Sequence, residues 1–187
     1  MTRLKIIFIC LMVCSLHVQG QSVYKNKNYG FSVTQPKGWS RQVAFDKNGV
    51  VFDSPGASSV SAEIRVGARV IQPFEDAPSS SQTLDKIMNS FSETLEEYGK
   101  ATKLSILRKE RIFFGGMDGG LIAARYTDSK TGNARYVIEA DAIHPSGAVY
   151  SVALECDPKE SAHFTSIFEE VLRSLTVRKN PRGKLIR

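Results

Sequence analysis

Two carboxylates, Glu139 and Asp141, stand two residues apart in a stretch of apolar residues. In a β-strand, residues i and i+2 point to the same face, about 7 Å apart. A pair held in this way could act in acid–base chemistry or bind a cation. The competing interpretation is a solvated or salt-bridged sheet face with Arg135 nearby. We favour this structural role, so a hydrolase that uses Glu139 and Asp141 is the weakest functional hypothesis.

The remaining nucleophilic and metal-ligating side chains form no pattern typical of a catalytic or metal site. Two histidines follow the leader described below, His144 in a His-Pro-Ser-Gly turn and His163 beside an apolar helical stripe. Neither stands at a zinc-ligand spacing from Cys, Asp or Glu. Cys156 ends an apolar alternation and is predicted to be a small core residue. We therefore predict no catalytic residue, no bound metal and no cofactor, and hence no enzyme.

A glycine cluster, Gly115-Gly116 and Gly119-Gly120, could suggest a phosphate-binding loop. No Lys-Ser or Lys-Thr follows it, and its flanks are typical of strands rather than of a strand that leads into a helix. A turn over residues 115–120 that joins two strands explains these glycines better.

The first twenty residues are typical of a secretory signal peptide. Arg3 and Lys5 precede the apolar run 6–14, which is too short to span a bilayer, and Gly20 offers a small residue at the cleavage site. We place the cleavage near Gly20 and expect a periplasmic or secreted protein. A lipoprotein acylated at Cys14 is disfavoured, because bulky Val13 precedes the cysteine.

The net charge of +6 belongs to the end of the chain, since residues 171–187 hold six basic residues and no acidic one. Residues 178–187 also contain Pro181 and Gly183, so we predict a basic disordered tail. Weak contact of this tail with anionic lipid is an alternative to a merely solvated end. Nucleic acid is not expected as a partner of an exported chain.

The residues between leader and tail, 21–177, predict one α+β domain. Short alternating segments separated by turn residues indicate an antiparallel sheet of about six to seven strands. Two apolar stripes with helical spacing predict two main helices that pack on this sheet. One stripe runs over Leu84, Ile87, Met88, Phe91, Leu95 and Tyr98. The other follows a predicted capping box that begins at Asp157 and runs over Phe164, Ile167, Phe168, Val171, Leu172 and Leu175.

The registers of two hairpins follow from side-chain alternation. Pairing Arg125 with Tyr136, and Ile143 with Val149, gathers most of the apolar residues on one face. Tyr126, Glu139 and Asp141 then lie on the opposite, less apolar face. We regard these three residues as a candidate binding face.

The segments Tyr29-Gly30-Phe31-Ser32-Val33 and Pro36-Lys37-Gly38-Trp39 resemble the opening strand and turn of the PsbP-like family. Gly147 to Tyr150 and Arg173-Ser174-Leu175 are similar to later motifs of that family, so the resemblance spans about residues 24–177. It implies the antiparallel α/β/α sandwich of PsbP and DcrB, and a role as an accessory or binding protein. No catalytic residue comes with it, and no metal-retaining residues match those of the photosynthetic member.

Our leading hypothesis is an exported accessory protein that engages an envelope or membrane-associated protein partner. The alternative is a small-molecule or lipid carrier with a pocket between the sheet and a helix. Neither the partner nor a ligand can be identified from the residues alone.

Overall fold

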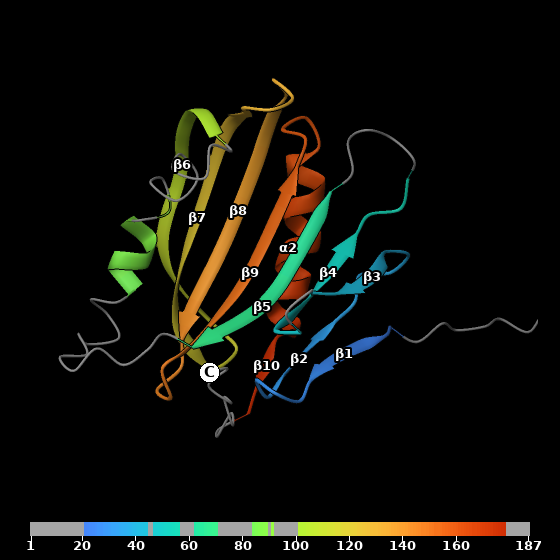
Figure 1. Ribbon diagram of the computed structural model, residues 1–187, viewed down its shortest axis with the longest axis vertical. Coiled ribbons are helices and arrows are strands. Elements are labelled where there is room, and N and C mark those ends of the chain that lie inside the picture. Colours follow the sequence, from blue (N-terminus) through green and yellow to red (C-terminus); the bar gives the residue numbers. More distant parts are fainter. Residues whose placement is uncertain are drawn as a thin grey trace, which may run out of the picture.

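The computed structural model describes residues 21–44, 47–56, 62–70, 84–89, 91 and 101–178. Their centre is a seven-stranded antiparallel sheet in the order β3-β4-β5-β9-β8-β7-β6 (Figure 1). The strands are β3 (Ser40–Val43), β4 (Gly49–Asp53), β5 (Glu63–Val70), β6 (Ala101–Phe114), β7 (Met117–Asp128), β8 (Ala134–Ile143) and β9 (Ala148–Cys156). The predicted leader, residues 179–187 of the predicted tail and the predicted helical positions Leu95 and Tyr98 lie outside the described residues.

A second sheet joins the two ends of the described chain. Its three strands, in the order β1-β2-β10, are β1 (Val23–Asn26), β2 (Phe31–Thr34) and β10 (Thr176–Val177). The Ser32 and Thr176 hydroxyls lie 2.7 Å apart, and the backbone N–H of Arg178 donates to the carbonyl of Gly30 at 2.9 Å. The chain therefore closes by pairing its last described strand with its second one.

Both predicted hairpin registers are confirmed. Arg125 pairs with Tyr136 between β7 and β8, and Ile143 pairs with Val149 between β8 and β9. Alternation therefore assigns each side chain of these strands to the predicted face, and the apolar face is the one that packs against helix α2 (Ser161–Ser174).

The two faces of the large sheet carry cores of different size. The α2 face holds the larger core, which includes Phe164, Phe168 and Val171 of α2 together with Tyr150, Val152 and other strand residues. On the opposite face, the helical residues Leu84–Asn89 and Phe91 cover a smaller cluster. Its strand members are Ala101, Ile122, Ala124, Tyr126 and Val137. The predicted class, an α+β sandwich with an antiparallel sheet between two helices, is confirmed.

The predicted turn over residues 115–120 is too long. Only Gly115 and Gly116 form the turn, and β7 begins at Met117, which pairs with Phe114. Both turn glycines have positive φ, 59° and 81°, as the tightest hairpin turns require. Gly119 and Gly120 are strand residues, needed because Phe114 and Met88 lie where their side chains would be.

The predicted capping box at Asp157 is also wrong. Helix α2 begins at Ser161, and no side chain caps its first turn. The Asp157 carboxylate instead accepts the backbone N–H of Lys159 at 2.7 Å. Asp157 therefore stabilises a turn that precedes the helix, because its side chain finds a donor two residues later, as in an Asx-turn.

No helix among the described residues is long and apolar enough to cross a membrane.

Candidate functional site

The acidic pair lies on the sheet face opposite α2. In the registers of the sheet, Glu139 stands between Ile122 of β7 and Ala153 of β9, while Asp141 stands between Gly120 and Ser151. Glu139 is half-buried, and Asp141 is only 7% exposed. Ser151 donates its hydroxyl hydrogen to the Asp141 carboxylate. The prediction that the two carboxylates share one face is correct, but Asp141 is buried and Glu139 is half-buried, so this is not the solvated face that was expected.

Burial dominates the electrostatics of this pair. It raises the pKa of both carboxyl groups, and the neighbouring Asp141 charge helps to raise the pKa of Glu139 to about 8. The positive charge of Arg69 opposes both shifts, and Arg65 adds to this effect at Glu139. A hydrogen bond between the two carboxyl groups favours a protonated Glu139 beside an ionised Asp141.

Arg135 does not accompany the acidic pair as expected. Its Nε donates to Glu155 at 3.0 Å, on the strand β9 that adjoins β8.

Tyr126 pairs with Arg135 in the sheet register. Burial, and to a lesser extent the charge of Glu155, raises the pKa of the Tyr126 phenol. Tyr126 is only 5% exposed and lies four residues along β7 from Ile122, the neighbour of Glu139. At strand rise this is about 13 Å, so the structure places Tyr126 apart from the two carboxylates.

The histidines and the cysteine lie apart from one another. His144 faces Ser146 within its turn, and burial lowers its pKa, while His163 is exposed on α2 beside Phe164. Cys156 is fully buried in the larger core, and burial raises the pKa of its thiol to about 12. Among the described residues, no group of three His, Cys, Asp or Glu side chains could hold a metal ion.

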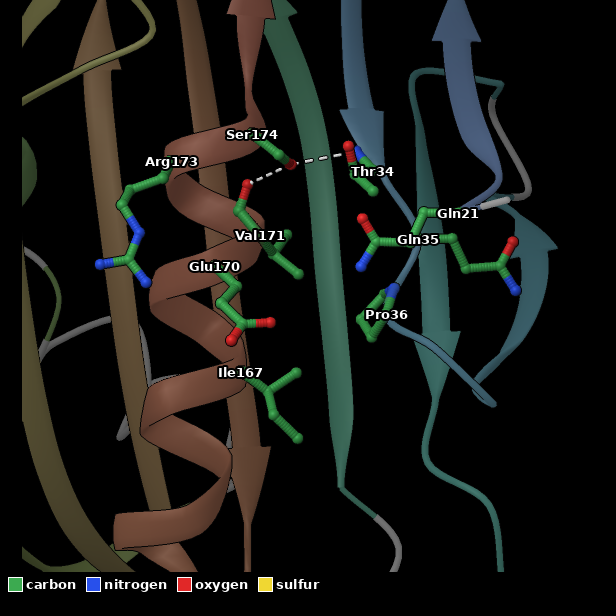
Figure 2. Close-up of a pocket in the computed structure, with 9 residues that line it drawn as sticks. All are labelled: Gln21, Thr34, Gln35, Pro36, Ile167, Glu170, Val171, Arg173 and Ser174. Atoms are coloured by element: carbon green, nitrogen blue, oxygen red, sulfur yellow. Dashed lines mark hydrogen bonds between the residues drawn. The ribbon is translucent and has the colours of Figure 1, made fainter. Parts of the chain in front are cut away.

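A groove of about 500 Å³ runs between α2 and the segment that follows β2; we call it the α2–β2 groove (Figure 2). Ile167, Glu170 and Val171 form the helical wall, and Gln35 and Pro36 lie opposite. The Ser174 hydroxyl links the two walls at one end: it donates to the carbonyl of Val171 at 2.7 Å and accepts the N–H of Thr34 at 3.0 Å. The mixed polar and apolar lining suits a small polar ligand or a partner's side chains.

A second pocket, of about 680 Å³, lies beside the β6–β7 turn; we call it the hairpin pocket. Its apolar lining includes Leu84, Ile112, Met117, Ile143 and Pro145. Phe113 stands at this pocket with 71% of its surface exposed. Neither the groove nor the hairpin pocket is lined by Glu139, Asp141 or Tyr126.

The hairpin pocket was not predicted from the sequence, although one signal for it was available. Phe113 and Phe114 are adjacent in a strand, and adjacent side chains point to opposite faces. A single core can therefore bury only one of them. Phe114 occupies the core on the α2 face, which leaves Phe113 on the other side of the sheet.

With this geometry described, comparison with known proteins identifies the family. The profile of the family described as serine/threonine kinase C-terminal domain matches residues 23–177, which cover every described strand and α2. The chain belongs to this family. None of the curated proteins compared with the chain matches it.

Solved structures show that the fold of this family member is the predicted PsbP-like fold. The cyanobacterial PsbP of Synechocystis sp. PCC 6803 matches with a TM-score of 0.59 and 12% identity, over 88% of this chain and 96% of its own. The Ran-binding protein Mog1p of Saccharomyces cerevisiae matches with a TM-score of 0.57 and 12% identity, over 84% and 95%. LpqN, described as involved in cell envelope biogenesis of Mycobacterium tuberculosis, matches with a TM-score of 0.55 and 16% identity, over 86% and 87%.

Proposed function

We propose that this chain is an exported accessory domain without catalytic activity that binds a protein partner through the hairpin pocket. The observation that carries the proposal is Phe113, a large aromatic side chain that is 71% exposed at a pocket lined by both apolar and charged side chains. Exposed aromatic side chains beside pockets are typical of the residues that contribute most to protein–protein binding.

The environment of the acidic groups also supports a binding role. Glu139 and Asp141 line neither the α2–β2 groove nor the hairpin pocket, and the Asp141 carboxylate already accepts a hydrogen bond from Ser151. A hydrolase would need such carboxylates at a cleft that admits substrate and water. Within the described residues, the pair is better explained as part of the structure.

The comparisons support the same proposal at the level of class. The matched family is described as a serine/threonine kinase C-terminal domain. Yeast Mog1p is described as a Ran-binding protein, and LpqN is described as acting in cell envelope biogenesis. The leader-like residues 1–20 and the envelope description of LpqN favour a location outside the cytoplasm, while the Mog1p description favours a binding role.

The test is site-specific photo-crosslinking in cells that produce the full chain. A photoreactive phenylalanine analogue replaces Phe113, and a matched control carries it at Val43, which is 57% exposed on β3 at the far end of the sheet. We expect one discrete crosslinked protein from position 113 and none from position 43. Equal crosslinking from both positions, or none from position 113, would refute the proposal.

The α2–β2 groove supports a second candidate function, carriage of a small polar molecule. Its volume of about 500 Å³ falls in the range of ligand sites, and Gln21, Gln35 and Glu170 supply polar groups. Replacing Ile167 by Trp should fill the groove. Native mass spectrometry of the purified chain should then show a bound mass that Ile167→Trp removes; a chain without any bound mass in either form would reject this function.

A further inference from the structure

Strand β6 forms one end of the seven-stranded sheet and is exposed along most of its 14 residues. The described residues include five large apolar side chains that are exposed. Three of them belong to β6: Ile106, Leu107 and Phe113. An edge strand presents unpaired backbone N–H and C=O groups, so an exposed apolar edge invites pairing with another chain.

The part of β6 nearest the hairpin pocket pairs with β7 in one continuous register. Register shifts against β7 fall between Thr102 and Ser105 and between Ile106 and Arg108, whereas pairing from Arg108 to Phe114 continues without a shift. Bulges are one way to protect an edge. The unprotected segment is therefore 108–114, and Phe113 at the hairpin pocket belongs to it. At the other end of the large sheet, β3 has only four residues.

The charge around this edge is predominantly positive. Lys103, Arg108, Lys109 and Arg111 of β6 and Arg125 of β7 are all exposed. The acidic groups that contact them are Glu110, bound to Arg108 at 2.6 Å, and Asp85, bound to Arg111 at 2.6 Å. β7 also carries the acidic residues Asp118 and Asp128. On β6 itself, four basic residues stand against one acidic residue, so the edge strand is net positive and attracts an acidic segment.

The same charges argue against two other occupants. A second copy that paired β6 with β6 would bring together two strands that each carry four basic residues and one acidic residue, which is unfavourable. The chain's own C-terminal residues 178–187 are themselves basic. An acidic, extended segment of a different protein fits the edge best.

We propose that an acidic segment of the protein partner adds to β6 as an extra strand along residues 108–114 and places an apolar side chain in the hairpin pocket. This inference rests on the proposed function and specifies its surface and its partner chemistry. Main-chain hydrogen bonds to the edge supply affinity, while the pocket and the basic side chains supply specificity.

Three synthetic peptides of eight residues test the inference with the purified full chain. The first alternates glutamate with valine, the second has lysine in place of glutamate, and the third is the first with every second amide N-methylated. We expect fluorescence anisotropy to show at least tenfold tighter binding of the first peptide than of the other two. We also expect amide hydrogen exchange to slow at residues 108–114 when the first peptide is bound.

Charge reversal on two edge strands provides the matched comparison. Lys109→Glu should weaken binding of the glutamate peptide about tenfold, whereas Lys25→Glu on β1, also exposed, should leave it unchanged. Equal binding of the N-methylated peptide would overturn strand addition, and equal binding of the lysine peptide would overturn the acidic partner. A concentration-dependent dimer in sedimentation that Lys109→Glu alters and Lys25→Glu does not, without binding of any peptide, would instead identify a second copy as the occupant.

The two proposals can fail separately. If position 113 crosslinks to a protein while no peptide binds at β6, the chain is a binding protein that does not use strand addition. If the glutamate peptide binds β6 while position 113 crosslinks to nothing in cells, the edge is competent but the proposed partner site is wrong.

Discussion

At the scale of single residues, Glu139 connects the fold to pH. Its carboxyl group is half-buried beside Asp141, and its pKa is raised to about 8, chiefly by burial. An unfolded glutamate titrates near pH 4.5, so between these values the folded chain holds a proton that the unfolded chain has released. The resulting stabilisation is complete below about pH 4.5 and is lost as the pH rises through 8.

We therefore predict that the free energy of unfolding falls between pH 5 and pH 9, and that Glu139→Gln removes most of this fall. Glutamine is neutral at every pH and can still donate a hydrogen bond to Asp141. Denaturant titrations at pH 5, 7 and 9 measure the effect, and Glu63→Gln on the exposed β5 pair with Arg65 is the control. The same slope in wild type and Glu139→Gln would show that another group carries the pH dependence.

Only part of the environment of Glu139 and Asp141 could be predicted from the sequence. Alternation along one strand sufficed to put Glu139 and Asp141 on a common face. The strands that flank β8 and their registers followed from the two hairpins. The positive charges that act on the pair, Arg65 and Arg69, belong to β5, which comes from a distant part of the chain, so the pattern of one strand does not contain them.

At the scale of elements, one glycine determines how the helical residues 84–89 approach the sheet. A Cβ at Gly120 would lie 2.1 Å from the sulfur of Met88, so the helix packs directly on the β7 backbone. Polar contacts fix the outer side of the same helix, because Asp85 and Asn89 bind Arg111 and Lys109 of β6. The helix therefore supports the edge strand as well as covering the smaller core.

We predict that Gly120→Ala destabilises the domain by about 1 to 3 kcal/mol, since an added methyl group overpacks this contact. Adding Met88→Ala should restore part of the loss by making room, whereas Met88→Ala alone should destabilise by leaving a cavity. Thermal unfolding of the three variants forms a double-mutant cycle. Additive effects would show that Gly120 and Met88 do not meet.

Elements differ in how far the sequence specifies them. The two hairpin registers followed from alternation, because a slip of one residue would expose an entire apolar face. The beginning of α2 did not follow: the residues at 157–160 match a capping box, but Asp157 satisfies the N–H of Lys159 in a turn. A cap and an Asx-turn use the same residue types, so composition alone does not separate them.

At the scale of the whole molecule, the small sheet ties the end of the chain to its beginning. Beyond α2, Leu175 is buried in the larger core, and Val177 of β10 packs against that core. The hydroxyls of Ser174 and Thr176 then bind β2, at Thr34 and Ser32. These contacts couple α2 to the first hairpin across more than 130 residues of sequence.

We predict that ending the chain after Leu175 destabilises the domain by about 2 kcal/mol, because β10, its hydrogen bonds and the packing of Val177 are lost. Ending it after Arg178 keeps β10 and should leave the stability unchanged. Chemical denaturation of both truncated chains measures the difference. Equal stabilities would mean that β10 contributes nothing to the fold.

The late position of β10 has a consequence for biosynthesis. A ribosome makes the chain from its N-terminus, so β1 and β2 are made before the other described strands, and β10, which completes their sheet, is made after all of them. Until β10 has been made, the edge of β2 that pairs with it has no neighbouring strand. The small sheet is therefore completed only after β10 has been made: a nascent chain stalled before residue 175 should be more sensitive to protease than one in which β10 has left the exit tunnel.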